Sequence, residues 1–409
     1  MDPLMPFFGP KYKPIVGLDI GTSVIRAMEV RPSGSRWQLH RWHQTLVPSS
    51  IMTDGKLKKS DEAVQLLQDF HKKGKFTTKK IALSIGGPSI ISKKIFVDPM
   101  SEMELEDQIS LEAEENIPFD IEEVYLDFQI LGTVDDKMAV LLTACKKDLV
   151  EDKMEICREA GLSPIVLDLD VLCLANAFTA FHQKSKNQDK KEKTGKMKLW
   201  PLKKGAKSAK EPPKESYKGP QKSHPAGSLD KTNATKNPTD TLIALADVGN
   251  QHLNTVVLAN GTVDYTRDLA FGAKSMIAEV IEQTGLTMEE AQLALQTPPT
   301  EASIGSLKDA WENIVTPFEA KLAVQIRQSL DFFQSSRSSK EKVQSLLLSG
   351  GAAAIAGIDQ RLGQHLGIPV TIFNPILQLK QDRHHPAPSS DQSAGFAVSL
   401  GLALRGISP

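Results

Sequence analysis

One pattern occurs twice in the sequence: an apolar strand that ends in Asp-x-Gly and continues, after a short turn, into another strand. The first copy contains Asp19 and Gly21, and the second contains Asp247 and Gly249. A single Asp-x-Gly is common by chance, whereas two copies about 228 residues apart in matching surroundings favour an internal duplication. Since each copy continues into helices and further strands, we expect a duplicated α/β fold of two domains.

Hydrophobic periodicity assigns similar elements to both halves of the chain. In the first half we expect strands at 14–20, 24–30, 37–47, 80–87 and 164–170, and helices at 60–73 and 171–181. In the second half we expect strands at 241–247, 254–259, 263–269, 343–350 and 369–373, and helices at 273–284, 287–295, 307–334, 351–366 and 394–405. The helix over 307–334 should kink near Pro317. Residues 88–160 have the pattern of an inserted α+β subdomain.

The charge is distributed unevenly along the chain. Residues 184–236 contain 16 lysines and five acidic residues, so this stretch carries +11 and the remainder carries −12. The stretch is rich in Pro, Gly, Ser, Thr and Asn, and it cannot bury enough apolar surface to offset its ordering entropy. We therefore expect a disordered basic linker at 183–239 between a first domain at 14–182 and a second at 240–405.

Two interpretations of this lysine-rich linker remain open. It could be a flexible insertion, or it could contact anionic lipid headgroups of a membrane surface. It lacks interleaved aromatic residues, which argues against specific binding of single-stranded nucleic acid. No run of about 18 apolar residues occurs, so we expect no membrane span. Three widely spaced cysteines without metal-site spacing are typical of a reducing cytoplasm.

The repeated turns have the chemistry of a phosphate site. Glycine allows close backbone approach, and facing turns offer backbone N–H groups to phosphates. Asp19 and Asp247 could each hold the water shell of Mg²⁺, or they could simply cap the hairpin turns. The remaining candidate phosphate ligands follow these aspartates, namely Gly21, Thr22, Ser23, Gly249 and Asn250.

Two other groups of residues are candidates for the same site. A later apolar strand ends in Ser349-Gly350-Gly351 and passes into a helix at Ala352, a turn that could admit a nucleoside. Asp168 and Asp170 could position an attacking water as catalytic carboxylates. The alternative for these two is a strand end followed by a helix N-cap.

These motifs resemble those of the actin-like ATPase superfamily, which has a ribonuclease H-like fold. Asp19-Ile-Gly-Thr-Ser23 resembles its first phosphate loop, Asp247-Val-Gly249 its second, and Leu348-Ser-Gly-Gly351 its adenosine motif. The segments 112–119 and 122–128 are similar to the PilM family of type IV pilus assembly proteins in particular. The resemblance covers about 14–182 and 240–405.

The resemblance implies ATP with Mg²⁺ in the cleft between two domains, and an inserted subdomain that corresponds to 88–160. It also implies a cytoplasmic scaffold of the pilus machine. Such a scaffold would dock the N-terminal cytoplasmic peptide of a PilN-type inner-membrane protein in a groove beside the subdomain. Through its partners it would be peripheral to the inner membrane, in contact with other pilus components, and it could self-associate into a ring.

The chain departs from the family pattern around the expected nucleotide. Asn250, Gln251 and His252 stand where relatives have small or hydroxyl residues, and large side chains there could crowd the phosphates. Gln292 and Leu295 stand where relatives have Glu and Lys facing the adenosine, and Ala352 replaces a third glycine. We expect an ATP-binding adaptor with at most weak hydrolysis. The alternatives are an actin-fold ATPase or phosphotransferase, and an FtsA-like cell-division protein.

Overall fold

Two five-stranded sheets form the framework of the computed structural model, which describes residues 13–34, 36–53, 56–87, 90–134, 136–182, 241–297, 305–337, 341–382 and 385–407. The strand orders are β10-β6-β1-β2-β3 and β15-β14-β11-β12-β13. In each sheet the central strand, β1 or β11, pairs antiparallel with the next strand and parallel with a later one. The internal duplication expected from the two Asp-x-Gly motifs is therefore present in the topology. The lysine-rich linker lies outside the described residues.

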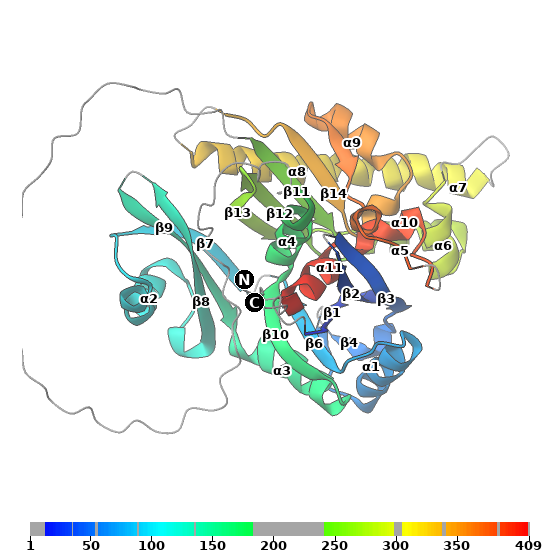
Figure 1. Cartoon of the computed structure of the whole chain (residues 1–409). Coiled ribbons are helices and arrows are strands. Elements are labelled where there is room, and N and C mark those ends of the chain that lie inside the picture. Colours follow the sequence, from blue (N-terminus) through cyan, green and yellow to red (C-terminus); the bar gives the residue numbers. More distant parts are fainter. Residues whose placement is uncertain are drawn as a thin grey trace, which may run out of the picture.

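The first sheet is built from strands at the positions expected from the sequence. Its elements are β1 (Val16–Ile20), β2 (Val24–Ser33), β3 (Arg36–Leu46), the short hairpin β4 (Met52–Thr53) and β5 (Lys56–Leu57), α1 (Asp61–Lys73), β6 (Lys80–Ile85), α3 (Lys147–Glu159), β10 (Ser163–Leu169) and α4 (Asp170–His182). Helices α1 and α3 pack on the outer side of this sheet. Figure 1 shows them at the bottom of the molecule.

The second sheet has its own helical cover. Its elements are β11 (Leu242–Val248), β12 (Leu253–Ala259), β13 (Thr262–Leu269), α5 (Lys274–Thr284), α6 (Met288–Ala294), α7 (Gly305–Ala310), α8 (Thr316–Ser335), β14 (Ser345–Ser349), α9 (Ile358–Leu366) and β15 (Val370–Ile372). A π-helical turn, Trp311–Val315, joins α7 to α8 directly before Pro317. The helix break thus lies where proline was expected to cause one. Helices α5, α8 and α9 share a hydrophobic core with the outer face of this sheet.

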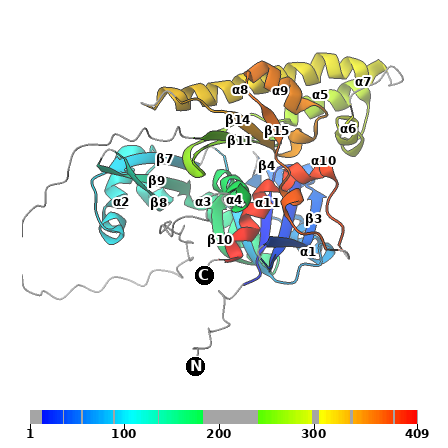
Figure 2. The same ribbon diagram turned by 45° about the horizontal axis from the view of Figure 1, so that its top comes forward.

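Two helices lie between the sheets, as both views show (Figures 1 and 2). One is α4, and the other is the C-terminal helix α11 (Ala397–Ala403), which follows the short α10 (Ser390–Ser393). The sequence analysis placed 394–405 in the second domain, but α11 packs against β1, β2 and α4 of the first. Gly17 permits this, since a Cβ there would lie 2.1 Å from the Ser399 carbonyl oxygen. A helix that is buried on all sides has no polar face to hold it at the surface.

The inserted subdomain is a separate three-stranded sheet of order β7-β9-β8, covered on one side by α2. Its elements are β7 (Ile90–Val97), α2 (Glu102–Asn116), β8 (Val124–Val134) and β9 (Lys137–Lys146). The sequence pattern predicted that it extends to residue 160. In the structure α3 instead packs against α1 and β10, with Met154 and Cys157 in the core of the first domain. No helix in the described part of the chain combines the length and the apolar composition that crossing a membrane requires.

Candidate functional site

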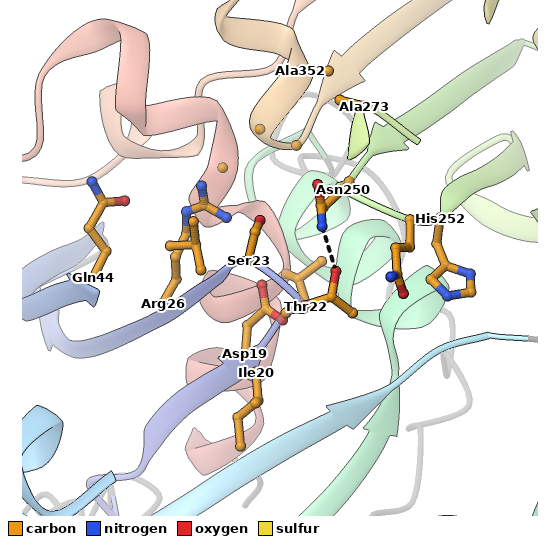
Figure 3. Close-up of a pocket in the computed structure, with 18 of the residues that line it drawn as sticks. Asp19, Ile20, Thr22, Ser23, Arg26, Gln44, Asn250, His252, Ala273 and Ala352 are labelled. Carbon is orange, nitrogen blue, oxygen red and sulfur yellow. Dashed lines mark hydrogen bonds between the residues drawn. The ribbon is translucent and has the colours of Figure 1, made fainter. Parts of the chain in front are cut away.

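A cavity of about 780 Å³ lies between the two sheets, at the ends of their central strands. Figure 3 shows the side chains that surround it. It is lined by almost all the residues singled out from the sequence: Asp19, Gly21, Thr22, Ser23, Asp170, Asp247, Gly249, Asn250, Gln292, Gly350, Gly351 and Ala352. Residues from both ends of the chain therefore meet in one place.

The two Asp-x-Gly turns have the same internal hydrogen bond. The Gly21 N–H donates to the Val24 carbonyl over 3.1 Å, and the Gly249 N–H donates to the His252 carbonyl over 2.8 Å. Glycine is needed in the first turn, because a Cβ on Gly21 would lie 2.8 Å from the Val24 oxygen. The turns are thus structural copies of each other, with backbone groups at the cavity wall.

Strand register places a row of polar side chains at the end of each sheet. In the first sheet Asp19 pairs with Arg26, and Arg26 pairs with Gln44 on β3. Residues directly opposite each other in a ladder lie on the same face, so these three side chains line the cavity together. Arg26 was missed by the sequence analysis, although the hairpin register of β1 and β2 would have placed it opposite Asp19.

The second sheet carries the matching row. Asp247 lies between Asn254 on β12 and Ser349 on β14. The Ser349 hydroxyl donates to Asp247 Oδ1 over 2.7 Å, which favours the ionised carboxylate. Asn254 is in turn opposite Asp268 on β13. This row therefore runs from the nucleoside turn to the edge strand of the sheet.

Three partly buried carboxyl groups come close together in the cavity. The pKa of Asp19 is raised to about 7 by burial and by the neighbouring Asp170 charge, while Arg26 and Lys153 act in the opposite direction. Burial also raises the pKa of Asp247 to about 6, against the effects of Ser349 and Arg26. The pKa of Asp170 is raised by burial as well. These shifts indicate negative charge that the protein neutralises only in part.

Two cations from the first domain face this cluster. Burial lowers the pKa of Arg26, which Asp19 and Asp247 counteract. Its Nε atom is buried, and no described group accepts a hydrogen bond from it. Lys153 on α3 also lines the cavity, where its Nζ donates to the Ser84 carbonyl over 2.7 Å. Lys153 is another residue that the sequence analysis did not identify, since nothing local distinguishes it on its helix.

Asp168 does not belong to the site. It lies on β10, two residues before Asp170, but its carboxylate accepts a hydrogen bond from Arg405 Nε over 2.6 Å. Residues two positions apart on a continuous strand would share a face, but β10 ends at Leu169 and the chain enters α4 at Asp170, which redirects the Asp170 side chain. Of the two carboxylates suggested for catalysis, the structure brings only Asp170 to the cavity.

The nucleoside turn lies on the second-domain side of the cavity. Gly350 has a φ of +92°, and a Cβ there would lie 2.4 Å from the Val248 carbonyl oxygen, so only glycine fits. Ala352 and Gln292 line the cavity as expected. Around them the wall is mainly apolar, with contributions from Met276, Ile277, Leu293, Leu295 and Ile355.

His252 does not crowd the space between the two turns. Its ring turns away from Thr22 and Asn250, as Figure 3 shows, and its Nδ1 lies 3.0 Å from Asp268 Oδ1. This hydrogen bond raises the pKa of His252, which burial opposes. The side chain expected to obstruct the phosphates therefore makes a contact at the edge of the sheet.

Comparison with known families and structures agrees with this architecture. A family model described as type IV pilus assembly protein PilM matches residues 17–197 and 228–407. The chain is also similar to a solved PilM-PilN type IV pilus biogenesis complex, with 21% identity over 98% of this chain and 100% of that chain, and a TM-score of 0.72. The ethanolamine utilization protein EutJ from Carboxydothermus hydrogenoformans matches with 14% identity over 97% and 90% of the chains, and a TM-score of 0.50. The fold is thus the actin-like one implied by the sequence motifs.

Proposed function

The chain belongs to the PilM family of type IV pilus assembly proteins, and from this premise we propose that it is a nucleotide-binding, actin-like scaffold of the pilus assembly machinery. The observation that carries the nucleotide proposal is the pair of matching glycine turns on opposite sides of one cavity. Backbone N–H groups held in this way form a concave site for anions. A carboxylate at the end of each preceding strand completes the arrangement.

The phosphates of ATP would lie between the two turns. Backbone N–H groups of Thr22, Ser23 and Asn250 would donate to them, and the hydroxyls of Thr22 and Ser23 are further donors. The Arg26 guanidinium would supply positive charge, since its Nε is buried without an acceptor among the described residues. Charge-assisted hydrogen bonds of this kind are the strong ones.

Mg²⁺ fits this site if it is held through its own water molecules. Within the described residues, no three His, Cys, Asp or Glu side chains are grouped closely enough to bind a metal ion directly. Asp19 and Asp247 would instead orient waters of a hydrated ion, which suits the preference of Mg²⁺ for oxygen ligands and retained water. The pKa values of both carboxyls are raised in the absence of a cation. A cation bound nearby would favour the ionised carboxylates and lower these pKa values again. When bound, Mg²⁺ would neutralise phosphate charge and orient the chain of phosphates.

The nucleoside would lie against the turn from Gly350 to Ala352, with Gln292 at its side. The apolar wall around Leu295 suits a base that is bound mainly by packing. Without the Glu and Lys that relatives place there, binding would depend more on the phosphate side of the cavity.

A second candidate function, an ATPase or phosphotransferase, is favoured by one observation. Asp170 begins α4 at the cavity, opposite the turns where phosphate would lie. A carboxylate there could accept a proton from an attacking water or hydroxyl. We place the scaffold first, because the family to which the chain belongs is one of pilus assembly proteins.

A PilN-type inner-membrane protein is the proposed partner. The solved structure to which this chain is similar is a PilM-PilN complex. We propose that an N-terminal cytoplasmic peptide docks beside the inserted subdomain, where Asp127 on β8 lies near Asp168 and Arg405 of the first domain. The protein would then be cytoplasmic and held at the inner membrane by its partners. Ring formation, contacts with other pilus components and membrane contact through 184–236 are part of the same proposal.

Calorimetric titration of the full chain tests the two candidate functions together. ATP with Mg²⁺ is added with and without a PilN N-terminal peptide, and phosphate release is measured in parallel. Binding of nucleotide and peptide without turnover supports the scaffold. Turnover that does not depend on the peptide supports the enzyme. Absence of binding by both ligands would overturn the proposal.

A further inference from the structure

Strand β13 of the second domain contacts the stem of the inserted subdomain through three of its side chains. Asp264 Oδ1 accepts a hydrogen bond from Lys94 Nζ on β7 over 2.5 Å, and the Thr266 hydroxyl lies 3.4 Å from the Ser92 carbonyl. Asp268 Oδ2 accepts from the Gly87 N–H over 2.5 Å. These contacts show that all three side chains face the stem, with Asp264 at the point where the register of β13 with β12 shifts.

Asp268 differs from the other two because it also contacts the second phosphate turn. Its Oδ1 pairs with His252 Nδ1 over 3.0 Å, while its Oδ2 accepts from Gly87. The His252 carbonyl is the acceptor that closes the Gly249 turn. One carboxylate thus joins the wall of the nucleotide cavity to the segment that leads into the inserted subdomain.

Gly87 is fitted to this contact in two ways. Its φ of +104° is readily adopted only by glycine, and a Cβ there would lie 3.2 Å from His252 Cε1. The stem therefore passes close to the imidazole with its N–H directed at Asp268. Gly87 also lies between β6, which carries Ser84, and β7, which begins the inserted sheet.

The contact between stem and second domain combines these hydrogen bonds with apolar side chains such as Ile85, Ile91 and Leu169, and it is partly hollow. A cavity of about 230 Å³ lies there, lined by Gly87, Ser92, Thr266 and Asp268, and it shares Asp170 and Asn254 with the nucleotide cavity. Asn254 is buried, and no described group donates to its Oδ1. Interfaces held by a few hydrogen bonds around a void separate more easily than packed apolar cores, which allows two discrete arrangements.

Resting on the proposed nucleotide function, we infer that Asp268 is a positioning residue that transmits the state of the second phosphate turn to the inserted subdomain. A nucleotide bound between the turns changes the position of His252, whose backbone is part of the second turn. Asp268 conveys the change to Gly87 and so to β7. The occupancy of the cleft then determines how firmly the second domain holds the inserted subdomain. This is the subdomain beside which we propose that the partner peptide docks. Thermodynamic linkage makes the effect reciprocal. If nucleotide changes the affinity of the subdomain for its ligand by some factor, that ligand changes the nucleotide affinity by the same factor.

Hydrogen–deuterium exchange of the full chain, with and without AMP-PNP and Mg²⁺, tests this inference. In the unaltered chain the nucleotide should change the exchange rates of the amides in both turns and of those in β7 by about fivefold or more. In Asp268→Ala the change at the turns should persist and the change in β7 should disappear. Asp268→Asn keeps the shape of the side chain and one acceptor oxygen, so it should retain part of the change in the exchange rates of β7. This variant keeps the test valid if Asp268→Ala fails to fold.

Asp264→Ala is the matched control, since Asp264 also lies on β13 and contacts the stem through Lys94 without touching the second turn. It should leave the response of β7 to nucleotide intact. An unaltered chain whose β7 does not respond, or an Asp268→Ala chain whose β7 still does, would overturn the inference. Calorimetry on the same samples separates this from failure of the proposed function, in which AMP-PNP would not bind the unaltered chain at all.

Discussion

Asn250 Nδ2 donates a hydrogen bond to Thr22 Oγ1 over 3.1 Å, and so joins the two phosphate turns directly across the cavity. The two residues are 228 positions apart and occupy the same place in the two copies of the motif. A ligand that lies between the turns must replace this contact with its own. We therefore expect this hydrogen bond to hold the two turns together.

Removing this contact should loosen both turns. A hydrogen bond of this kind contributes about 1 kcal/mol net, so Asn250→Ala should raise the exchange rates of amides in both turns about fivefold without nucleotide. Hydrogen exchange at 19–24 and 247–252 measures this. Gln251→Ala, a neighbouring change in the cavity wall, serves as the control. Equal exchange in the Asn250 variant and the unaltered chain would refute this role.

Asp19→Ala should weaken binding of ATP with Mg²⁺ by about tenfold or more, which corresponds to about 1.4 kcal/mol. The reason is the loss of the carboxylate proposed to orient Mg²⁺-bound water, next to the first turn. The fold should persist, because the change removes a partly buried carboxyl whose pKa is already raised. The control is titration with ATP in EDTA, which removes Mg²⁺. Under this condition the variant and the unaltered chain should bind ATP with similar affinity. A tenfold loss in EDTA as well would place Asp19 on the nucleotide rather than on the metal.

Arg26→Met should destabilise the chain and should do so more at high pH. The buried guanidinium faces Asp19 and Asp247, and its removal leaves their charges uncompensated. We expect a loss of about 2 kcal/mol or more at pH 8. At pH 6 the loss should be smaller, since both carboxyls can then take up a proton. Urea unfolding at the two pH values measures this, with the exposed Arg36→Met on β3 as control.

His252 should make folding stability depend on pH. Asp268 raises its pKa above the ordinary value of 6.5, and the Asp170 charge acts in the same direction, while burial opposes both. The protonated imidazole is therefore favoured in the folded chain. Its stabilising effect is complete below pH 6.5 and is lost as the pH rises through the folded pKa. The Tm difference between the unaltered chain and His252→Ala should thus shrink from about pH 6 to about pH 8. Asp268→Asn should flatten this trend, and a difference that grows with pH would contradict it.

Gly17→Ala should destabilise the first domain by about 1–3 kcal/mol or more. The new Cβ would lie 2.1 Å from the Ser399 carbonyl and 2.4 Å from the Ala403 nitrogen, both backbone atoms of α11 that cannot swing aside. Thermal unfolding measures the loss. Gly305→Ala is the control, because a Cβ there meets nothing within 4 Å. If the two variants have the same Tm, α11 does not pack closely against β1 at Gly17.

The sequence predicted the parts of the site that depend on local backbone chemistry. The Asp-x-Gly turns and the turn at Gly350 lie at the cavity, and glycine is required at Gly21, where another atom approaches the backbone, and at Gly350, where φ is also positive. The strands flanking them also occur where periodicity placed them. These features depend on residues within a few positions of each other, which a single sequence displays directly.

The remaining assignments depended on which distant segments pack together. Asp168 and Asp170 are two residues apart and look equivalent in the sequence, yet Arg405 pairs with the first and leaves only the second at the cavity. Arg26 became part of the site through the register of β1 with β2, and α11 crossed to the first sheet because Gly17 leaves room for it. Asp268 reaches Gly87 across 181 positions of sequence.

The sequence by itself therefore determined that this chain has two Asp-x-Gly turns in a duplicated fold of the PilM family. Only the tertiary structure decided which charged groups face those turns and which residue links them to the inserted subdomain. The physical reason is that a turn is stabilised by its own backbone hydrogen bonds. The surroundings of a buried charge are set instead by helices and strands that come from remote parts of the chain.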